Sequence, residues 1–206
     1  MKKKVERVIL TLIGIFILFI GITTISYNFY LGTVAKIFWL CYIGMILIGI
    51  GILRKDSFLI VSQLNLISLT LILWTIDFFS SIIFGINIFG LSSYYSQLPT
   101  FWKIMTIYHI ILLPLSFYAL YLIKLERKDA WKISFVQVTI FYFIIKWFTY
   151  PEYNLNDVFH SGISFIPTLP YYPIQWFILA FLMIITTNFL INKVYFYSKD
   201  IKYDTS

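Results

Sequence analysis

The chain alternates long apolar runs with short polar connections. Six runs can be drawn, covering residues 8–25, 34–53, 57–86, 101–123, 131–150 and 173–197. Each is close to the roughly 20 residues that a helix needs to cross the hydrocarbon core. The runs lack the polar/apolar alternation of barrel strands, and an open sheet would leave backbone amides unpaired in lipid. The pattern predicts an all-α, polytopic membrane protein with six transmembrane helices in one domain, residues 1–206.

Two of the runs carry local signals. The second contains Gly44, Gly49 and Gly51, which allow neighbouring helices to approach closely. The third is long enough for one tilted helix, and a break near Ser80 and Ser81 is the alternative.

Composition supports the membrane class. Of the 206 residues, 60% are hydrophobic, 21% are aromatic and only 12% are charged, more apolar surface than a water-soluble domain of this size could bury. The basic start followed by an apolar run imitates a signal peptide, but the run is long and no small-residue cleavage site follows. We therefore expect an uncleaved first helix. The single cysteine, Cys41, excludes an intrachain disulfide framework.

The basic residues indicate the orientation. Of the 16 Lys and Arg residues, 13 lie at the two terminal ends and in alternate connections; the exceptions are Lys36, Lys103 and Lys146. The positive-inside rule then predicts that both termini are cytoplasmic (N-in/C-in) in a multi-pass protein of the cell membrane. The net charge of +7 is thus a topology signal, and we expect no nucleic-acid partner.

A carboxylate inside the third run, Asp77, is the most informative residue. A charge at bilayer depth costs on the order of 3 kcal/mol on insertion scales, so such a residue is a functional hypothesis once a partner can be named. With ideal helices, Asp77, His109 and Lys146 fall at one depth near the outer surface. We expect Asp77 and His109 to approach within direct or one-water reach, with Trp74 and Tyr108 as walls.

The longest connection, residues 150–172, lies above this level. It contains no Lys or Arg, and its polar residues include Asn154, Asn156, Asp157 and His160. These positions complete an expected outward-facing polar pocket. Its catalytic residues would be His109 and Asp77, and its substrate-binding residues would be Lys146, Trp74, Asn154, Asn156, Asp157 and His160.

Such a set suits general-base chemistry. A carboxylate can orient an imidazole and raise its basicity, and the imidazole can then activate water or a hydroxyl. A neighbouring cation can stabilise an oxyanion or hold a lipid phosphate. No metal-site spacing such as His-Glu-x-x-His occurs, so we expect no metal and no cofactor.

Each residue also has a structural interpretation. Lys146 can snorkel to the interface, and His109 can be a buried imidazole bonded to a neighbouring helix. Asp77 can be a hydrogen bonder between helices, and Asn154 and Asn156 can be turn formers.

The succession Trp74-x-x-Asp77-Phe78, His109-x-x-x-x-Pro114 and Asn154-x-Asn156-x-Val158-Phe159 resembles a group of small uncharacterised prokaryotic six-helix membrane proteins. More distantly it resembles the androgen-induced and androgen-dependent TFPI-regulating hydrolases, multi-helix enzymes that cleave fatty acid esters of hydroxy fatty acids with an intramembrane Thr and His. That likeness rests on Ile76-Asp77 with the run to Ile86 and on His109 before Pro114. It implies that His109 is the catalytic histidine.

One departure concerns the nucleophile. In that family the Thr stands three residues before the Asp, whereas Thr75 stands two before Asp77 and faces elsewhere on a regular helix. Water, Thr70 or Ser81 are the alternatives. The sequence favours a lipid-ester hydrolase or acyl transferase with membrane lipids as partners. The alternatives are a non-catalytic lipid-binding or accessory membrane protein and, third, a proton-coupled carrier.

Overall fold

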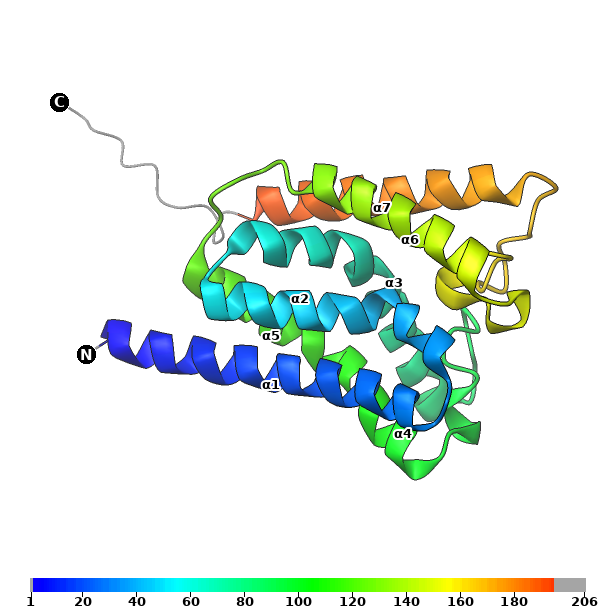
Figure 1. Ribbon diagram of the computed structural model, residues 1–206, viewed down its shortest axis with the longest axis horizontal. Helices are drawn as coiled ribbons and strands as arrows, with labels where there is room; N and C mark the ends of the chain where they lie inside the picture. The colour runs from blue at the N-terminus through cyan, green and yellow to red at the C-terminus, as the bar shows by residue number, and fades with distance from the viewer. Residues whose placement is uncertain (1, 195–206) are drawn as a thin grey trace.

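The computed structural model describes residues 2–194, and every regular element among them is helical. The long helices lie alongside one another in Figure 1. Their bounds are α1 Lys2–Tyr30, α2 Leu40–Arg54, α3 Ser57–Phe84, α4 Thr100–Thr106, α5 Tyr108–Ile123, α6 Trp131–Phe148 and α7 Tyr172–Lys193. The end of the last predicted span, to residue 197, lies outside the described residues.

Five helical spans are long and apolar enough to cross a membrane, with α4 and α5 together forming one of them. This confirms an all-helical protein compatible with multiple membrane passes. The second predicted helix is different: residues 34–38 form the short 3₁₀ helix η1, and α2 begins only at Leu40. With 15 residues, α2 is about 22 Å long, which is shorter than the hydrocarbon core of about 30 Å.

Helix α3 is the central element. Residues 61–68 are all buried, so this stretch is surrounded on every side, and α3 contacts α2, α5, α6 and α7. It runs continuously from Ser57 to Phe84, and the alternative break near Ser80 does not occur. Its start is fixed by Asp56, whose side chain accepts a hydrogen bond from the backbone N–H of Leu59 at 3.0 Å.

The fourth predicted helix is interrupted at Ile107, between α4 and α5. The backbone N–H of Ile110 donates to the carbonyl of Ile107, one residue nearer than in a regular α-helix. The carbonyl of Thr106 is therefore released from the helical ladder. In Figure 1, α4 diverges from the bundle at the lower right.

Helices α1 and α2 pack through glycines. A Cβ atom added at Gly49 would lie 2.9 Å from Cβ of Leu18 and 3.0 Å from the carbonyl oxygen of Gly14. The absence of side chains at Gly14 and Gly49 thus lets the two backbones approach closely.

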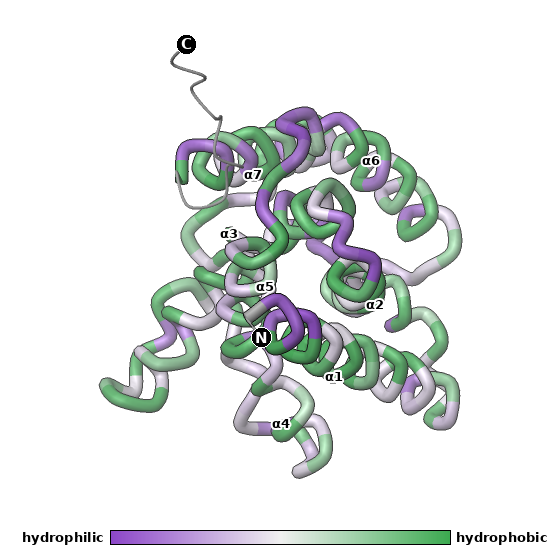
Figure 2. The backbone as a smooth tube through the Cα atoms, turned by 90° about the vertical axis from the view of Figure 1, so that its left-hand side faces the viewer, coloured by the Kyte–Doolittle hydropathy of each residue, from purple (hydrophilic) through white to green (hydrophobic). Residues whose placement is uncertain are grey.

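The polar connections gather at the ends of the bundle. The N-terminus, the α2–α3 turn and the α5–α6 connection share the left end of Figure 1, and the loops of residues 85–99 and 149–171 lie at the opposite end. Figure 2 shows, from that left-hand side, largely hydrophobic helices with hydrophilic stretches such as the start of α1. The connections predicted to be cytoplasmic and those predicted to be outside therefore lie at opposite ends of the bundle.

Candidate functional site

Asp77 is completely buried on α3, and both its carboxylate oxygens bind the loop that follows the helix. Oδ1 accepts from the backbone N–H of Phe89 at 2.7 Å, and Oδ2 accepts from the backbone N–H of Ser92 at 2.7 Å. The Ser92 hydroxyl also donates to Oδ2, at 2.9 Å. The carboxylate thus folds residues 85–92 back onto the end of α3.

The sequence predicts that Asp77 approaches His109 directly or through one water, and the direct contact is not found among the described residues. No hydrogen bond or ion pair joins Asp77 to His109 or Lys146 within residues 2–194. Periodicity indicated that Asp77 avoids lipid, but it could not reveal that the chain turns back at Gly85 and presents backbone N–H groups. Gly85 adopts φ 69°, a left-handed conformation that glycine tolerates well.

His109 lies at the break between α4 and α5. Its Nδ1 is 2.8 Å from the carbonyl oxygen of Thr106, the one that the break released. A carbonyl only accepts, so Nδ1 carries the proton in this contact and the lone pair of a neutral ring is on Nε2. Within the described chain, no hydrogen bond to Nε2 occurs.

Aromatic rings enclose the imidazole. Trp74 stacks on His109 with ring centroids 4.6 Å apart, and Tyr108 stacks on it with centroids 4.1 Å apart. The expectation that these two residues form its walls is confirmed. Both are buried, whereas His109 itself is partly exposed.

Around these walls lies a group of polar side chains that the sequence did not identify. The indole N–H of Trp74 donates to the Tyr94 hydroxyl at 3.1 Å, and the Tyr108 hydroxyl donates to Sγ of Cys41 at 3.1 Å. Burial of its hydroxyl end raises the pKa of Tyr94 to about 12, so this phenol stays protonated at neutral pH. The signal was present only as a cysteine and two tyrosines on separate segments of the chain.

Lys146 does not join this group. Its side chain is exposed on α6, and its ammonium lies 4.4 Å from the centre of the Phe159 ring. The contact is a cation–π interaction at the bundle surface, in agreement with the interpretation of a snorkelling lysine.

The residues of the long connection mainly organise that connection. Asn154 accepts through Oδ1 from the backbone N–H groups of Phe159 and His160, at 3.0 and 3.1 Å. Its amide donates to the carbonyl of His160 at 3.0 Å, while His160 itself is exposed. Asn154 therefore closes a turn, as one of its two interpretations proposed.

Asn156 acts at longer range. Its Oδ1 accepts from the backbone N–H of Leu40 at 3.0 Å and its Nδ2 donates to the carbonyl of Phe38 at 2.9 Å. The first N–H group of α2 is thus capped by a residue more than a hundred positions away. Trp176 donates to the carbonyl of Asn156 at 2.9 Å and so ties the start of α7 to the same point.

Asp157 differs from its neighbours because its carboxylate has little support. Within residues 2–194 its one hydrogen bond is a long contact of 3.5 Å from the amide of Asn154. Burial raises the pKa of Asp157 to about 6. Asn154, Asn156 and Asp157 all have positive φ angles, an unusual run that Asn and Asp tolerate better than other residues.

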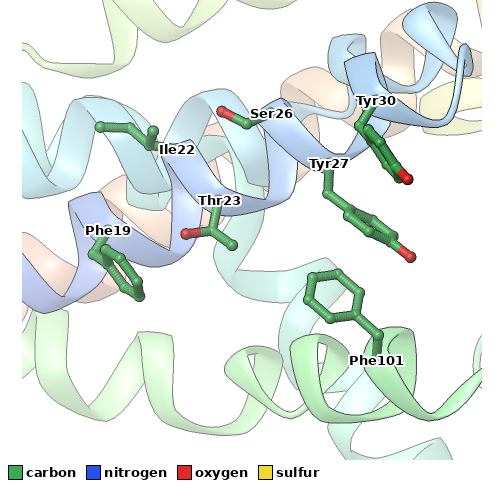
Figure 3. Close-up of a pocket in the computed structure, with 7 residues that line it drawn as sticks. All are labelled: Phe19, Ile22, Thr23, Ser26, Tyr27, Tyr30 and Phe101. Carbon is green, nitrogen blue, oxygen red and sulfur yellow. The ribbon is translucent and has the colours of Figure 1, made fainter.

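A separate groove of about 430 Å³ lies between α1 and α4. Figure 3 shows its lining, which is Phe19, Ile22, Thr23, Ser26, Tyr27, Tyr30 and Phe101. The lining is apolar apart from a few hydroxyl groups, and none of the predicted site residues belongs to it.

The predicted site thus divides into parts. His109, Trp74 and Tyr108 come together, Asp77 and Asn156 secure loops, and Lys146 and His160 are exposed. Within residues 2–194, no three His, Cys, Asp or Glu side chains are placed to hold a metal ion. No family model, curated protein or solved structure matches the chain.

Proposed function

We propose that the protein is a multi-pass cell-membrane enzyme, with both termini in the cytoplasm, that cleaves or transfers acyl groups of lipid esters at the outer leaflet. The observation that carries this proposal is the state of His109. Its Nδ1–H is held by the Thr106 carbonyl and its Nε2 is left as a base between two aromatic walls. A base oriented through its other nitrogen is the usual arrangement for general-base catalysis.

The reaction follows from this geometry. Nε2 of His109 takes a proton from a water, or from an acceptor alcohol, as its oxygen attacks the ester carbonyl carbon. The Tyr94 hydroxyl, which accepts from Trp74, has its own proton left to donate to the oxyanion. His109 then returns the proton to the oxygen of the leaving alcohol. In this scheme the Thr106 carbonyl, rather than Asp77, orients the imidazole.

Purified protein in detergent or liposomes, given lipid esters from the outside, tests the proposal. We expect slow ester consumption that His109→Gln lowers about 100-fold or more, the usual size of a general-base contribution. Thr11→Val is the matched control, because the Thr11 hydroxyl only donates to the carbonyl of Arg7 on the exposed start of α1.

The second candidate is a non-catalytic lipid-binding or accessory protein. It is favoured by a specific observation: the polar groups of Asp77, Asn154 and Asn156 are occupied by backbone partners in the loops. Folded protein that consumes none of a broad set of phospholipid, glycerolipid and fatty acid esters, with His109→Gln behaving identically, would replace the enzyme proposal with this one.

A further inference from the structure

A second polar cluster lies far from His109, where α3 packs against α6 and α7. All but one of its members are buried, Gln137 being partly exposed. They are Ser62, Gln63, Asn65, Ser68, Ser134, Gln137, Thr187 and Asn188. Apolar helices can pack without buried polar side chains, so the presence of this cluster requires a separate explanation.

Most of the side-chain N–H groups in the cluster already donate hydrogen bonds to other groups of the protein. The amides of Gln63 and Gln137 form a reciprocal pair, with both distances 2.9 Å. The two N–H groups of Asn65 donate to Oγ of Ser134 and to Oδ1 of Asn188, each at 3.3 Å. Asn188 in turn donates to the carbonyl of Lys128 at 3.2 Å.

Three oxygen atoms in the cluster have no hydrogen-bond partner within the described residues. They are Oδ1 of Asn65, Oγ of Ser68 and Oγ1 of Thr187. These residues are only 1%, 2% and 4% exposed. Buried polar atoms of this kind are rare, and each one calls for a ligand or another physical reason.

The two hydroxyl groups also differ from many other Ser and Thr hydroxyls on the described helices. The hydroxyls of Thr24, Thr75, Thr106, Ser116, Thr139 and Thr149 all donate to the carbonyl four residues earlier. This bond is the ordinary way to satisfy a hydroxyl in an apolar helix. Ser68 and Thr187 do not form it within the described residues.

Helical geometry places the three residues on two helix faces that pack together. Ser68 lies three positions after Asn65 and therefore on the same face of α3. Thr187 and Asn188 belong to the buried face of α7, together with Ile184 and Ile191. Helices α3 and α7 are in contact, and Asn65 hydrogen-bonds Asn188 between them. Oδ1 of Asn188 also has a second lone pair.

The chemistry of this set points to one class of ligand. Amide and hydroxyl oxygens are hard, neutral ligands, of the kind that replace the hydration shell of a small cation. Among the described residues, the cluster contains no carboxylate, imidazole or thiolate, which a divalent metal ion would favour. We propose that Asn65, Ser68 and Thr187 bind a monovalent cation of the size of Na⁺ between α3 and α7.

Thermal unfolding of the purified full-length protein tests this proposal. The melting temperature is measured in NaCl and in choline chloride at equal ionic strength, over a range of Na⁺ concentrations. A ligand that binds only the folded protein raises the melting temperature with its concentration, so we expect a Na⁺-specific rise. Thr187→Val and Ser68→Ala each remove one ligand while preserving size, and each should weaken the apparent Na⁺ affinity several-fold.

Thr75→Val is the matched control, because it removes a hydroxyl from α3 that already bonds its own helix. It should leave the Na⁺ response unchanged. Equal melting temperatures in NaCl and choline chloride would overturn the proposal and leave an internal water as the only occupant. A Na⁺ response that both Thr187→Val and Ser68→Ala retain in full would also overturn it. Neither outcome depends on whether the protein cleaves lipid esters.

Discussion

At the scale of single residues, Asp77 shows what sequence reasoning can and cannot find. An apolar run with one carboxylate correctly indicated a buried, specifically paired group. The partner was a backbone loop of the same hairpin rather than an imidazole on another helix. Side-chain patterns report which residues avoid lipid, but they contain no information on backbone N–H groups that a turn brings within reach. The same limitation hid the role of Asn156 at the start of α2.

The paired state of Asp77 gives the first prediction. In Asp77→Asn one of the two oxygens becomes an amide N–H group that faces a backbone donor of Phe89 or Ser92. Leaving a buried donor unsatisfied costs about 1–3 kcal/mol, so thermal unfolding in detergent should occur at a clearly lower temperature. Asp56→Asn is the control, because Asn is an equally good helix cap there. An Asp77→Asn variant with the same melting temperature as the parent protein would refute this account.

Asp157 gives the second prediction, which concerns pH. Burial raises its pKa in the folded protein from 3.8 to about 6, so the folded state binds this proton more tightly than the unfolded state does. The contribution of Asp157 to stability is therefore present at low pH and is lost as the pH rises through about 6. Melting temperatures measured across this window should fall with rising pH in the parent protein. In Asp157→Asn the part of this pH dependence that comes from Asp157 should vanish. The same dependence of melting temperature on pH in both proteins would show that Asp157 is not its cause.

At the scale of elements, the sequence located the apolar segments well because hydrophobic length is a strong signal. The boundaries of α3, α6 and α7 fall close to the predicted runs. The late start of α2 and the interruption at Ile107 were missed. The first depends on a partner distant in sequence, and the second on a local contact between a side chain and a carbonyl, which an apolar pattern does not report. Asn156 caps the first N–H of α2, and His109 satisfies the carbonyl that the interruption frees. Pro114 was a visible signal, but the break lies a full two turns before it.

The glycine contact between α1 and α2 gives the third prediction. In Gly49→Ala the new methyl group meets Cβ of Leu18 and the backbone of Gly14, neither of which can move away easily. Overpacking of this kind typically costs about 1–3 kcal/mol, and the melting temperature should fall accordingly. Gly44→Ala on the same helix is the matched control. Its methyl group would lie 3.3 Å from Cδ1 of Ile67, the flexible end of a side chain. Equal effects of both substitutions would contradict a specific role for the Gly14–Gly49 contact.

At the scale of the whole molecule, the polar groups form two centres at different positions along the central helix α3. One surrounds His109 near the loops of residues 85–99 and 149–171, and the other joins α3 to α6 and α7. The sequence indicated the first because it contains ionisable residues, and it gave no sign of the second because Asn, Gln, Ser and Thr are unremarkable individually. Only the fold shows that these neutral groups from three helices are collected in one place.

The orientation of the molecule gives the last prediction. The basic residues are concentrated at the end of the bundle that holds the N-terminus, the α2–α3 turn and the α5–α6 connection, and Arg127 lies exposed there beside Asp129. Because positively charged loops are retained in the cytoplasm, a cysteine at Lys128 should be shielded from an impermeant thiol reagent in intact cells. A cysteine at Glu152, exposed in the opposite connection, should react without permeabilisation. Both are introduced on a Cys41→Ser background, which itself should give no labelling. Labelling at position 152 only after permeabilisation would show that the orientation is the opposite of the predicted one, with His109 near the inner leaflet.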